Sequence, residues 1–416
     1  MNILLIISGS ISCYKSIELL RLYVKSGFQV KVILSKGSQN FLKPELFNYL
    51  GAANTYLYND DFNPLYSKEV PLHIELARWT NIFVLCPMTA NTLARLTTGI
   101  ADDLITCTFL ALDKEIKKCF YPAMNSKMLE NDFVDQNLKK LEKILNTYIH
   151  PSDQGILACG EQGLGKLPEV EEIYYTSIYA TSIDESRINF PEKNSLITTG
   201  ATLAKLDPVR FITNPSSGLT GFELALESLR RGYTTTVIAG KYATNKLDYL
   251  KTLSNFKLIR VESTEQLFTS AKKFFKTCDF YFSPAAISDI QIKMENKKIK
   301  KDQLSNAIEI NHAPDVLKEL LLLKKKNQKM IGFAAETELT DINLAKKIKD
   351  KPVDLLVGTK VNHGDLLESP EGFQDSKAFY KIITREKTIH EGELKKANLA
   401  KLIFDYVDNN QGQQIK

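Results

Sequence analysis

The chain has few cysteines, and none of them is spaced for a metal site. Its 416 residues include six cysteines, with no C-x-x-C pair among them. They are Cys13, Cys86, Cys107, Cys119, Cys159 and Cys278. This scatter argues against a zinc site and a disulfide framework, and it favours a protein of the reducing cytoplasm.

Long hydrophobic runs and an excess of one charge are also missing. The longest apolar runs, such as residues 3–7, fall far short of the roughly 20 residues that a membrane-spanning helix needs. Met1 leads directly into such a run, without the basic and apolar regions of a secretory signal. The 54 basic and 49 acidic residues leave a net charge of only +5, so no basic field indicates nucleic acid. We therefore expect a cytoplasmic protein that binds neither membranes nor nucleic acid.

Strand and helix patterns alternate in both halves of the chain. In the first half we expect strands at residues 3–7, 30–34, 82–85 and 116–121, and helices at 89–96 and 104–112. In the second half we expect a helix from Gly218, strands at 234–239, 280–282, 308–310, 330–333 and 355–357, a hairpin at 378–383 and 388–390, and a helix from Glu393. A polar stretch at residues 175–194 separates the halves. The pattern predicts an α/β protein of two doubly wound domains, residues 1–185 and 190–416.

The opening stretch SGSISCYK, residues 8–15, stands between an apolar strand and an amphipathic helix. A strand, loop and helix of this kind point backbone N–H groups at a phosphate. The loop lacks the G-x-G-x-x-G fingerprint of dinucleotide sites and the Lys-Ser/Thr ending of a P-loop. PMTANTLARL, residues 87–96, repeats the arrangement with Thr89, Asn91 and Thr92, for which plain N-capping is the alternative interpretation.

Three further side chains of the first half could carry chemistry. His73 begins a helix, where it could polarise a substrate or act as a base; a capping or surface histidine is the alternative. Asn125, in YPAMNSKM, follows a strand at the sheet edge where α/β proteins bind ligands. Cys159 lies in the glycine-rich GILACGEQGLGK, which suggests a flap over a site, although an inert structural cysteine is the usual alternative.

In this order, the motifs resemble a known family. SGSISCYK, HIELARW, PMTANTLARLTTGIADDL, PAMNSKM and GILACGEQGLGK, within residues 2–172, are similar to motifs of the homo-oligomeric flavin-containing cysteine decarboxylases. In particular they look like the decarboxylase half of the bacterial bifunctional phosphopantothenoylcysteine decarboxylase/phosphopantothenate-cysteine ligases. The resemblance implies a flavodoxin-like domain that binds FMN. The implied FMN contacts are Ser8, Gly9, Ser10, Ser12, Thr89, Asn91 and Thr92.

The same resemblance implies that His73, Asn125 and Cys159 are catalytic. Decarboxylation of a cysteine needs an electron sink that its side chain lacks, and flavin provides one by oxidising the CH2–SH group. His73 would assist oxidation and CO2 loss, Asn125 would bind the carboxylate, and Cys159 would donate the proton of the re-reduction. Leu129 departs from the family, which commonly has an aromatic residue at this place.

The second half resembles the ligase half of the same bifunctional enzymes over residues 195–407. TGATLAKLDPVRFITNPSSGLTG keeps the Asp-Pro-Val-Arg and Ser-Ser-Gly elements of that family. The resemblance implies a Rossmann-like domain in which Ser216, Ser217 and Gly218 hold phosphates while Arg210 and Asn214 address the substrate. A capped helix after a proline turn is the alternative interpretation.

The nucleotide implied by the resemblance is CTP. Lys298, in KMENKKIKK, matches a lysine of a family loop that closes on the activated acyl nucleotide; a solvated lysine run is the alternative. The other implied contacts are Ala286, Asp289, Ala313, Pro314, Asp315, Val316, Phe333, Lys347 and Lys351. Ser288, Ile290 and Thr359 depart from the residues usual in the family.

The two resemblances together imply a bifunctional enzyme of coenzyme A biosynthesis. Its ligase would join 4'-phosphopantothenate to cysteine through an acyl-cytidylate, with CTP and Mg2+, and the sequence leaves the metal ligands unassigned. Its decarboxylase would convert 4'-phosphopantothenoylcysteine to 4'-phosphopantetheine with FMN. Relatives place the flavin site between subunits of trimers and pair their ligase halves, which implies a homo-oligomer, a dodecamer.

Two alternatives remain in view. One is a flavin-dependent decarboxylase of another cysteine-bearing substrate, against which the complete ligase half argues. The other is an FMN-binding regulatory subunit, which would be expected to lack His73 or Cys159, whereas the sequence has both.

Overall fold

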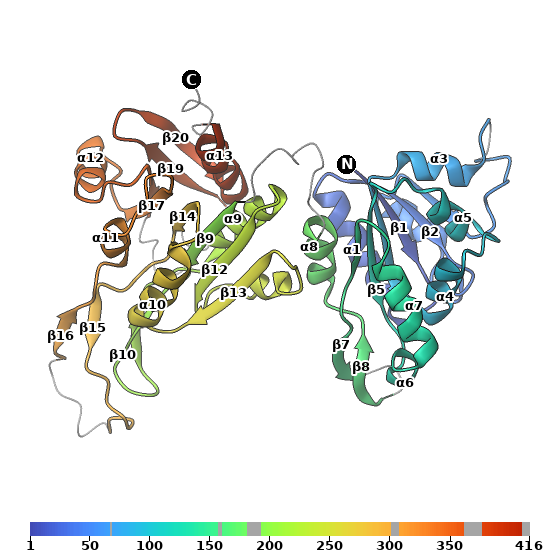
Figure 1. Ribbon diagram of the computed structural model, residues 1–416, viewed down its shortest axis with the longest axis horizontal. Coiled ribbons are helices and arrows are strands. Elements are labelled where there is room, and N and C mark those ends of the chain that lie inside the picture. Colours follow the sequence, from blue (N-terminus) through green and yellow to red (C-terminus); the bar gives the residue numbers. More distant parts are fainter. Residues whose placement is uncertain (67–68, 157–159, 181–192, 301–307, 362–376, 410–416) are drawn as a thin grey trace. The chain divides into compact units, whose positions relative to one another are not determined.

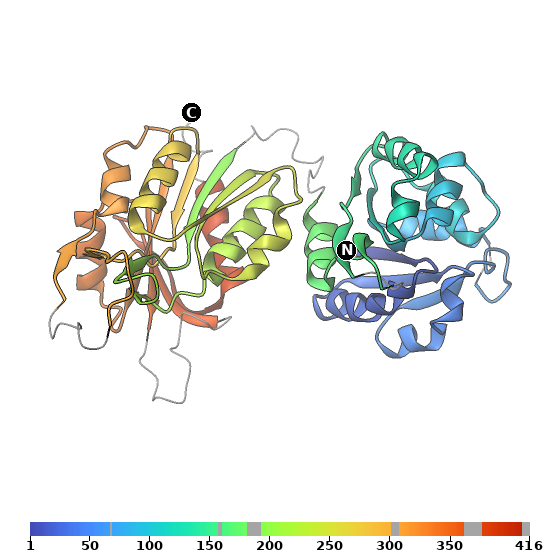
Figure 2. The ribbon, with the colours of Figure 1, turned by 90° about the horizontal axis from the view of Figure 1, so that it is seen from below.

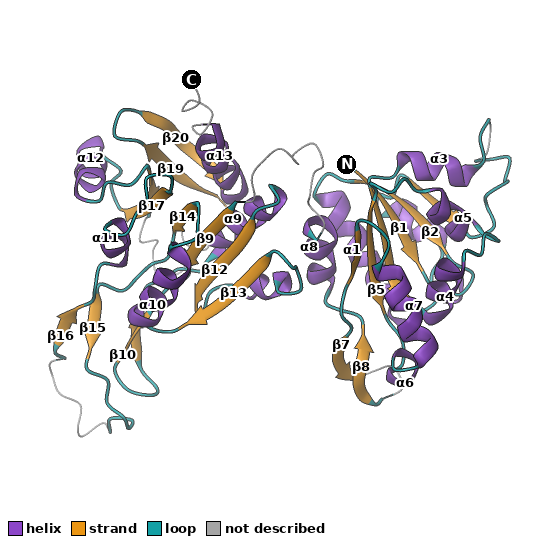
Figure 3. Cartoon of the chain, in the orientation of Figure 1, coloured by secondary structure: helices purple, strands orange, loops and turns teal. Residues whose placement is uncertain are grey.

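Two sheets, one in each half of the chain, organise the structure; the first is parallel and the second mostly parallel (Figure 1, Figure 3). It is a computed structural model that describes residues 1–66, 69–156, 160–180, 193–300, 308–361 and 377–409. The chain divides into two compact units, Met1–Thr181 and Ser182–Lys416. Helices cover both faces of each sheet, so the predicted doubly wound α/β class is confirmed. No described helix is long and apolar enough to cross a membrane.

The described part of the first unit has a six-stranded parallel sheet in the order β3-β2-β1-β4-β5-β6. Its strands are β1 (Asn2–Ile7), β2 (Gln29–Leu34), β3 (Asn54–Leu57), β4 (Ile82–Met88), β5 (Lys117–Pro122) and β6 (Thr147–Ile149). β1 is a continuous apolar run because residues 3–7 are fully buried between two helical layers. The strand order diverges between β1 and β4, which is where such sheets bind ligands.

The helices of the first unit form one layer on each face of its sheet (Figure 2). One layer shares a core with the sheet and consists of α1 (Lys15–Lys25), α2 (Pro44–Tyr49) and α8 (Val170–Tyr179). The other consists of α3 (Leu72–Trp79), α4 (Ala90–Thr98), α5 (Leu104–Ala111) and α7 (Asp132–Glu142). Smaller elements are η1 (Ile11–Tyr14), η2 (Ser38–Asn40), α6 (Ser126–Leu129) and the hairpin of β7 (Asp153–Ile156) and β8 (Gln162–Lys166).

The second unit repeats the same strand order and adds an antiparallel hairpin. Its described sheet has eight strands in the order β13-β12-β9-β14-β17-β18-β19-β20, of which β19 and β20 are antiparallel to their neighbours. The strands are β9 (Asn194–Thr199), β12 (Thr234–Gly240), β13 (Phe256–Val261), β14 (Phe280–Ser283), β17 (Lys329–Glu336), β18 (Leu355–Lys360), β19 (Lys377–Ile383) and β20 (Thr388–Lys395). The order diverges here between β9 and β14.

Strand β14 shows how the second sheet is covered on both faces. Its Tyr281 packs edge to face on Phe275, with ring centroids 5.6 Å apart. Its Phe282 points the other way and lies 4.8 Å from the ring of Phe404. The first face carries α10 (Thr264–Phe275), α11 (Val316–Leu321) and α12 (Asp341–Asp350), and the second carries α9 (Leu219–Arg230) and α13 (Lys396–Asn409). The remaining elements are η4 (Asn245–Leu250) and two ribbons, β10 (Leu203–Lys205) with β11 (Phe211–Thr213), and β15 (Ile290–Ile292) with β16 (Ile310–His312).

Two predicted boundaries are wrong. The strand expected at residues 388–390 continues to Lys395, because Glu391 and Glu393 still pair with β19, so the last helix begins at Lys396 and not at Glu393. The strand expected at residues 308–310 is β16, which pairs with β15 from Ile310 onward. The polar stretch at 175–194 first continues helix α8 to Tyr179, and residues 181–192 lie outside the described part of the chain.

Arg231, at the end of α9, connects this helix to the last helix, α13. Its guanidinium, 6% exposed, donates to Glu227 at 2.7 Å, to Asp405 at 2.5 Å and to Asp408 at 2.5 Å. Tyr233 adds a hydrogen bond from its hydroxyl to Asp408 at 2.7 Å. Loss of this nearly buried cation would deprive the buried carboxylate of Glu227 and the 16% exposed carboxylate of Asp408 of a partner, which is costly.

We predict that Arg231→Gln loosens α13. The free energy of opening of this helix should fall by about 3 kcal/mol or more, because one partner of a buried charge network is removed. Amide hydrogen exchange of residues 396–409, followed by mass spectrometry, measures this opening. The matched control is Arg230→Gln, since Arg230 binds the same Glu227 but is 45% exposed; its effect should stay below about 1 kcal/mol. Equal effects of the two variants would contradict the assignment.

Candidate functional site

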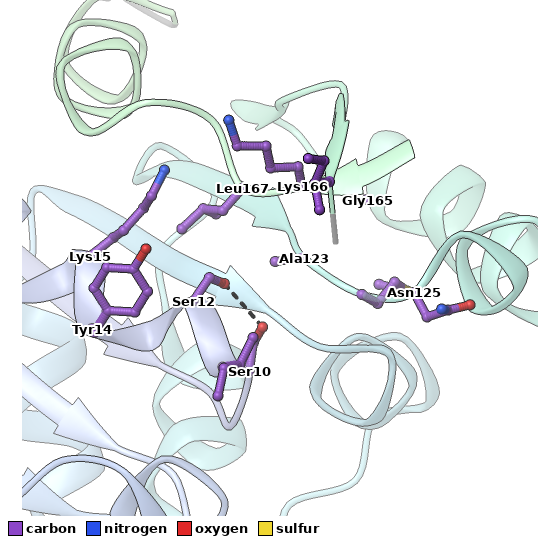
Figure 4. A pocket seen from close by; sticks show the side chains of 12 residues that line it. Ser10, Ser12, Tyr14, Lys15, Ala123, Asn125, Gly165, Lys166 and Leu167 are labelled. Carbon is purple, nitrogen blue, oxygen red and sulfur yellow. Dashed lines mark hydrogen bonds between the residues drawn. The ribbon is translucent and has the colours of Figure 1, made fainter. Parts of the chain in front are cut away.

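The loops after β1, β4 and β5 surround two neighbouring cavities at the point where the first sheet's strand order diverges. The larger has a volume of about 480 Å³ and the smaller about 390 Å³. Ser10, Ala123 and Met124 line both. Figure 4 shows the larger cavity between the loop of Ser10 and Ser12, the Asn125 segment and the end of strand β8. Volumes of this size are typical of small-molecule sites.

Ser8 holds the loops of this site together. Its hydroxyl is fully buried, donates to the carbonyl oxygen of Pro87 at 2.7 Å and accepts the N–H of Thr89 at 2.9 Å. The hydroxyl is thus occupied by protein groups and fixes the end of β1 to the start of α4. Ser10 and Ser12, unlike Ser8, line the larger cavity. Their hydroxyls lie 3.0 Å apart and form a hydrogen bond with each other (Figure 4).

Gly9 lies in close contact with the neighbouring loop after β2. A Cβ atom at Gly9 would come within 2.6 Å of the backbone of Gly37. Both glycines line the smaller cavity. The loop therefore requires glycine at position 9 in order to pack where it does.

Helix α4 begins at the smaller cavity, which Thr89, Asn91 and Thr92 line as predicted. Thr89 is the N-cap and accepts the N–H of Thr92 at 3.4 Å, so the capping interpretation of this residue is confirmed. Capping does not remove the other N–H groups of the first turn, which favour an anion at this end of the helix. Arg95 also lines the cavity, and its guanidinium pairs with Asp102 and Asp103.

The β7–β8 hairpin is attached to the Asn125 segment. Met124 donates its N–H to the carbonyl oxygen of Gly165 at 3.2 Å, and the hydroxyl of Ser126 donates to that of Leu164 at 2.6 Å. Gly165 has φ +121°, and a Cβ atom there would lie 2.0 Å from the carbonyl oxygen of Met124. Asn125 is the N-cap of α6 and lines the larger cavity. Cys159, which the sequence analysis placed in a glycine-rich flap, lies outside the described residues.

Lys15 is a residue of this cavity that the sequence analysis missed. Its ammonium group donates to the carbonyl oxygen of Pro168 at 3.3 Å and lies 3.5 Å from the carboxylate of Glu169. Its position at the start of the helix after the first loop was the available signal. Lys15 thus brings a positive charge to the cavity wall from the start of α1, directly after the segment of Ser10 and Ser12.

Three other cysteines of the first unit are poor proton donors. Burial raises the pKa of the Cys13 thiol to about 11 and that of Cys119 to about 12. Burial also raises the pKa of Cys86 well above its ordinary value. A thiol that must exchange a proton near neutral pH is therefore not one of these three.

His73 is paired with a buried aspartate that the sequence analysis missed. Its Nδ1 lies 2.8 Å from both carboxylate oxygens of Asp61, which also accepts the backbone N–H of His73 at 2.9 Å. Asp61 is buried, whereas the imidazole is 21% exposed. A proton on Nδ1 is thereby favoured, which leaves Nε2 to accept one. His73 is not among the described residues that line the two cavities, whereas Asn125 lines the larger one.

In the second unit, cavities again lie at the divergence of the strand order. One of about 120 Å³ is lined by Ser216, Gly218, Ala286, Phe333 and Thr359, among others. A second, more open one of about 530 Å³ is lined by Asn214, Ser216 and Ser217, so these predicted residues do converge. Gly218 is the N-cap of α9 with φ +77°, where a Cβ atom would lie 2.8 Å from that of Ala243.

The remaining residues predicted for the nucleotide are divided among several places. Ala313 and Pro314 line a third cavity, of about 280 Å³, with Lys205. Asp289 is exposed, and its carbonyl oxygen accepts the N–H of Ala313 at 2.9 Å. Val316 is buried in the core at the start of α11, where Asp315 is the N-cap. The structure thus gives Val316 a packing contact and no cavity position among the described residues.

Lysines 347 and 351 are engaged in ion pairs. Lys347 pairs with Glu336, and Lys351 lies 2.5 Å from the carboxylate of Asp315. Lys298 is exposed. In the described residues no three histidine, cysteine, aspartate or glutamate side chains form a group that could hold a metal ion.

Of the four departures from the family, Ser288 has a structural explanation. The hydroxyl of Ser288 donates to the carbonyl oxygen of Ile290 at 3.1 Å and so closes the turn before β15. Ile290 then opens that strand. Thr359 lines the small cavity at the end of β18, and nothing in the structure explains the choice of Leu129.

The chain matches two family models, one in each unit. The first is described as Flavoprotein and covers residues 1–181. The second is the DNA/pantothenate metabolism flavoprotein C-terminal domain and covers residues 190–410.

Several curated proteins are similar over most of the chain. The coenzyme A biosynthesis bifunctional protein CoaBC of Bacillus subtilis is 34% identical over 361 residues, 86% of this chain and 86% of that protein. The protein of the same name from Borreliella burgdorferi is 30% identical over 408 residues, 97% of this chain and 98% of that protein. A cysteine/cysteine sulfinic acid decarboxylase of an unknown prokaryotic organism is 31% identical over 327 residues, 78% of this chain and 87% of that protein.

Two solved structures each resemble one half of the chain. The C-terminal domain of a CoaBC protein is 25% identical, covers 53% of this chain and 97% of its own, and has a TM-score of 0.42. The FMN binding protein AtHal3 is 31% identical, covers 42% of this chain and 93% of its own, and has a TM-score of 0.37.

The contact of Gly165 with Met124 leads to a prediction. Gly165→Ala should destabilise the first unit by about 3 kcal/mol, because it adds a clash with a backbone carbonyl to a left-handed backbone. Gly160→Ala is the matched control, since its φ is +83° but a Cβ atom would meet nothing within 4 Å; it should cost about 1 kcal/mol. Urea unfolding followed by the fluorescence of Trp79, the single tryptophan, reports on this unit. Equal costs would show that the hairpin is not held against Met124.

Proposed function

The chain belongs to the family of coenzyme A biosynthesis bifunctional proteins, with decarboxylase and ligase activities, and we propose that its two units divide these activities between them. The first unit is a flavoprotein domain and would decarboxylate. The second would ligate. The observation that carries the proposal is that each unit has its own cavities at the divergence point of its own sheet.

We propose that the ligase unit activates 4'-phosphopantothenate with CTP. The substrate carboxylate attacks the α-phosphate of CTP, pyrophosphate leaves, and the amine of cysteine then displaces CMP from the acyl-cytidylate. Ser216, Ser217 and Gly218 would hold phosphate groups at the start of α9, and Asn214 would contact the acyl group beside them. Lys298, with Mg2+, would offset the repulsion between the two anions.

FMN fits the cavities of the first unit. The larger cavity has room for a small ligand, and the smaller one offers the start of α4 to a single phosphate. The hydroxyls of Ser10 and Ser12 and the backbone of Gly9 would contact FMN, and Thr89, Asn91 and Thr92 would surround its phosphate. When bound, the flavin supplies the electron sink that decarboxylation of a cysteine requires.

The residues of the first unit would act around the substrate's cysteine moiety. Asn125, at the cavity wall, would bind the carboxylate that is lost as CO2. His73, oriented by Asp61, would accept a proton on Nε2. Cys159 is assigned as the later proton donor on the family resemblance, and the high pKa values of Cys13 and Cys119 make these thiols unsuitable for the role.

We further propose that the protein acts in the cytoplasm as a homo-oligomer, a dodecamer of trimers and dimers. His73 is not among the described residues that line the two cavities, which supports this proposal, because a second copy could supply the histidine. Large exposed apolar side chains of the first unit, such as Phe62 and Leu65, give further surface for such contacts.

The central experiment separates the two activities by mutation. Lys298→Gln should reduce CTP-dependent CMP release about 100-fold, because a charge that stabilises the transition state is lost. It should leave CO2 release from supplied 4'-phosphopantothenoylcysteine unchanged. His73→Asn removes the proton acceptor, so it should reduce CO2 release about 100-fold or more. It should leave CTP-dependent CMP release unchanged.

Lys293→Gln is the control for the first variant, since Lys293 is an exposed lysine of the same segment. It should change neither reaction. If either catalytic variant abolishes both reactions in a folded protein, the division of labour is refuted. If the unmodified protein releases CO2 from another cysteine compound but no CMP, the alternative of a different cysteine decarboxylase is correct.

Asp61→Asn tests the orientation of His73. An amide can present its NH2 group to Nδ1 and so favour the other tautomer, with the proton on Nε2, where it blocks proton acceptance. The rate of CO2 release at saturating substrate should fall about 100-fold with flavin content and KM unchanged. Asp60→Asn is the matched control, because Asp60 is equally buried but does not contact His73: its oxygens accept the N–H of Leu57 at 2.8 Å and the side-chain amide of Asn63 at 3.0 Å. A lowered flavin content would instead assign Asp61 to the fold.

A further inference from the structure

The segment that carries Lys298 is docked on the loop between β10 and β11. Glu295 donates its N–H to the carbonyl oxygen of Leu206 at 3.0 Å. Four residues further on, both backbone polar groups of Ile299 are bonded to side chains of the same loop. The N–H of Ile299 donates to the carboxylate of Asp207 at 3.2 Å, and its carbonyl oxygen accepts from Arg210 at 2.9 Å.

Asp207 and Arg210 form an ion pair that is itself held in place by hydrogen bonds. The side chain of Asp207 is fully buried and accepts the N–H groups of Val209 and Arg210, each at 2.8 Å. Arg210 binds the other carboxylate oxygen through Nε at 2.9 Å and through a terminal nitrogen at 2.6 Å. The same terminal nitrogen donates to Ile299, so one guanidinium joins the carboxylate to the segment.

The electrostatics of Asp207 agree with this arrangement. Burial alone would raise the pKa of its carboxyl, but the hydrogen bonds from Arg210 and from the backbone of Val209, Arg210 and Ile299 outweigh burial and hold the pKa well below its ordinary range. Asp207 is therefore an anion whenever the protein is folded near neutral pH. The hydrogen bonds that it accepts are charge-assisted and stronger than those between neutral groups.

We propose that Asp207 and Arg210 are positioning residues for Lys298. They fix the backbone of Ile299 and thereby the origin of the adjacent lysine side chain, which is itself exposed. This inference rests on the proposed ligase function of the second unit. It gives Arg210 a different role from direct contact with the substrate: the arginine acts on the reaction through the lysine.

Fixing the backbone beside Lys298 would reduce the conformational entropy that is lost when this exposed lysine binds the substrate. A free segment with a long side chain samples many conformations, and each reaction would have to restrict them. A backbone that is already fixed leaves only the side-chain rotamers to be restricted when the phosphates bind. Misplacement of such a group by about 1 Å can cost about 100-fold in rate.

Limited proteolysis tests the structural half of the inference without reference to activity. In Arg210→Gln the segment should detach more often, so trypsin should cleave after Lys298 and Lys300 about tenfold faster, as judged by mass spectrometry of early fragments. Arg230→Gln is the matched control. Arg230 binds Glu227 through two nitrogens at the same sequence spacing, at the end of α9, and should leave the cleavage rate unchanged.

A double-mutant cycle tests the functional half. Arg210→Gln should lower CTP-dependent pyrophosphate release about 100-fold in the unmodified background. In the Lys298→Gln background the same change should have less than about a twofold further effect, because the group it positions is gone. Arg210→Lys keeps the charge but not the fork that reaches both Asp207 and Ile299, so its rate should fall between those of the unmodified and Arg210→Gln proteins.

The outcomes are separable. Independent, multiplying effects of the two mutations would overturn the inference and make Arg210 a direct substrate ligand. Unchanged cleavage of Arg210→Gln would overturn it as well. If the unmodified protein releases no pyrophosphate, the proposed function fails, while faster cleavage would still show that the two side chains hold the segment.

Discussion

The hydroxyl of Ser8 is the contact on which the first site depends. Parallel pairing places the ends of β1 and β4 side by side, but pairing alone does not align the loops that follow. Ser8 does so by accepting the N–H of Thr89 and donating to Pro87. This sets the start of α4 against the first loop, so the serines of that loop and the N–H groups of the helix face the same space. A buried hydroxyl with both partners satisfied is a rigid connection, because breaking it would leave polar groups unpaired in the core.

The second unit reaches a similar arrangement by different means. There the hydroxyl of Thr199, at the end of β9, donates to the carbonyl oxygen of Gly218 at 3.1 Å. Gly221, one turn into α9, packs so closely on Thr199 that a Cβ atom would lie 2.2 Å from its hydroxyl oxygen. A hydroxyl at the end of the first strand thus fixes the following loop in both units. The same strand order with a similar connection thus places cavities at the corresponding point of both sheets.

The elements could be predicted from the sequence, as could several residues that line the cavities, because both depend on local patterns. The buried run of β1 and the polar residues at the start of α4 are examples. The partners of these groups could not be predicted, since they are brought together by the fold. Asp61 lies twelve residues before His73, with no pattern that joins them. Ile299 is far in sequence from Asp207. Ser8 lies in a loop whose pattern is typical of phosphate binding, so its hydrogen bond to Pro87 could not be predicted.

The ion pairs of the second unit differ in how easily they could open. Lys347 and Lys351 are paired with Glu336 and Asp315, and all four side chains are at least 21% exposed. Exposed pairs contribute only about 0 to 1 kcal/mol, so a lysine can leave its carboxylate for a phosphate at little cost. The pair of Asp207 with Arg210 is different: the arginine is 34% exposed, but the carboxylate is fully buried, so leaving it without its partner would be costly. Exposed pairs are therefore suited to exchange partners during the reaction, and the pair with the buried carboxylate is suited to remain fixed throughout it.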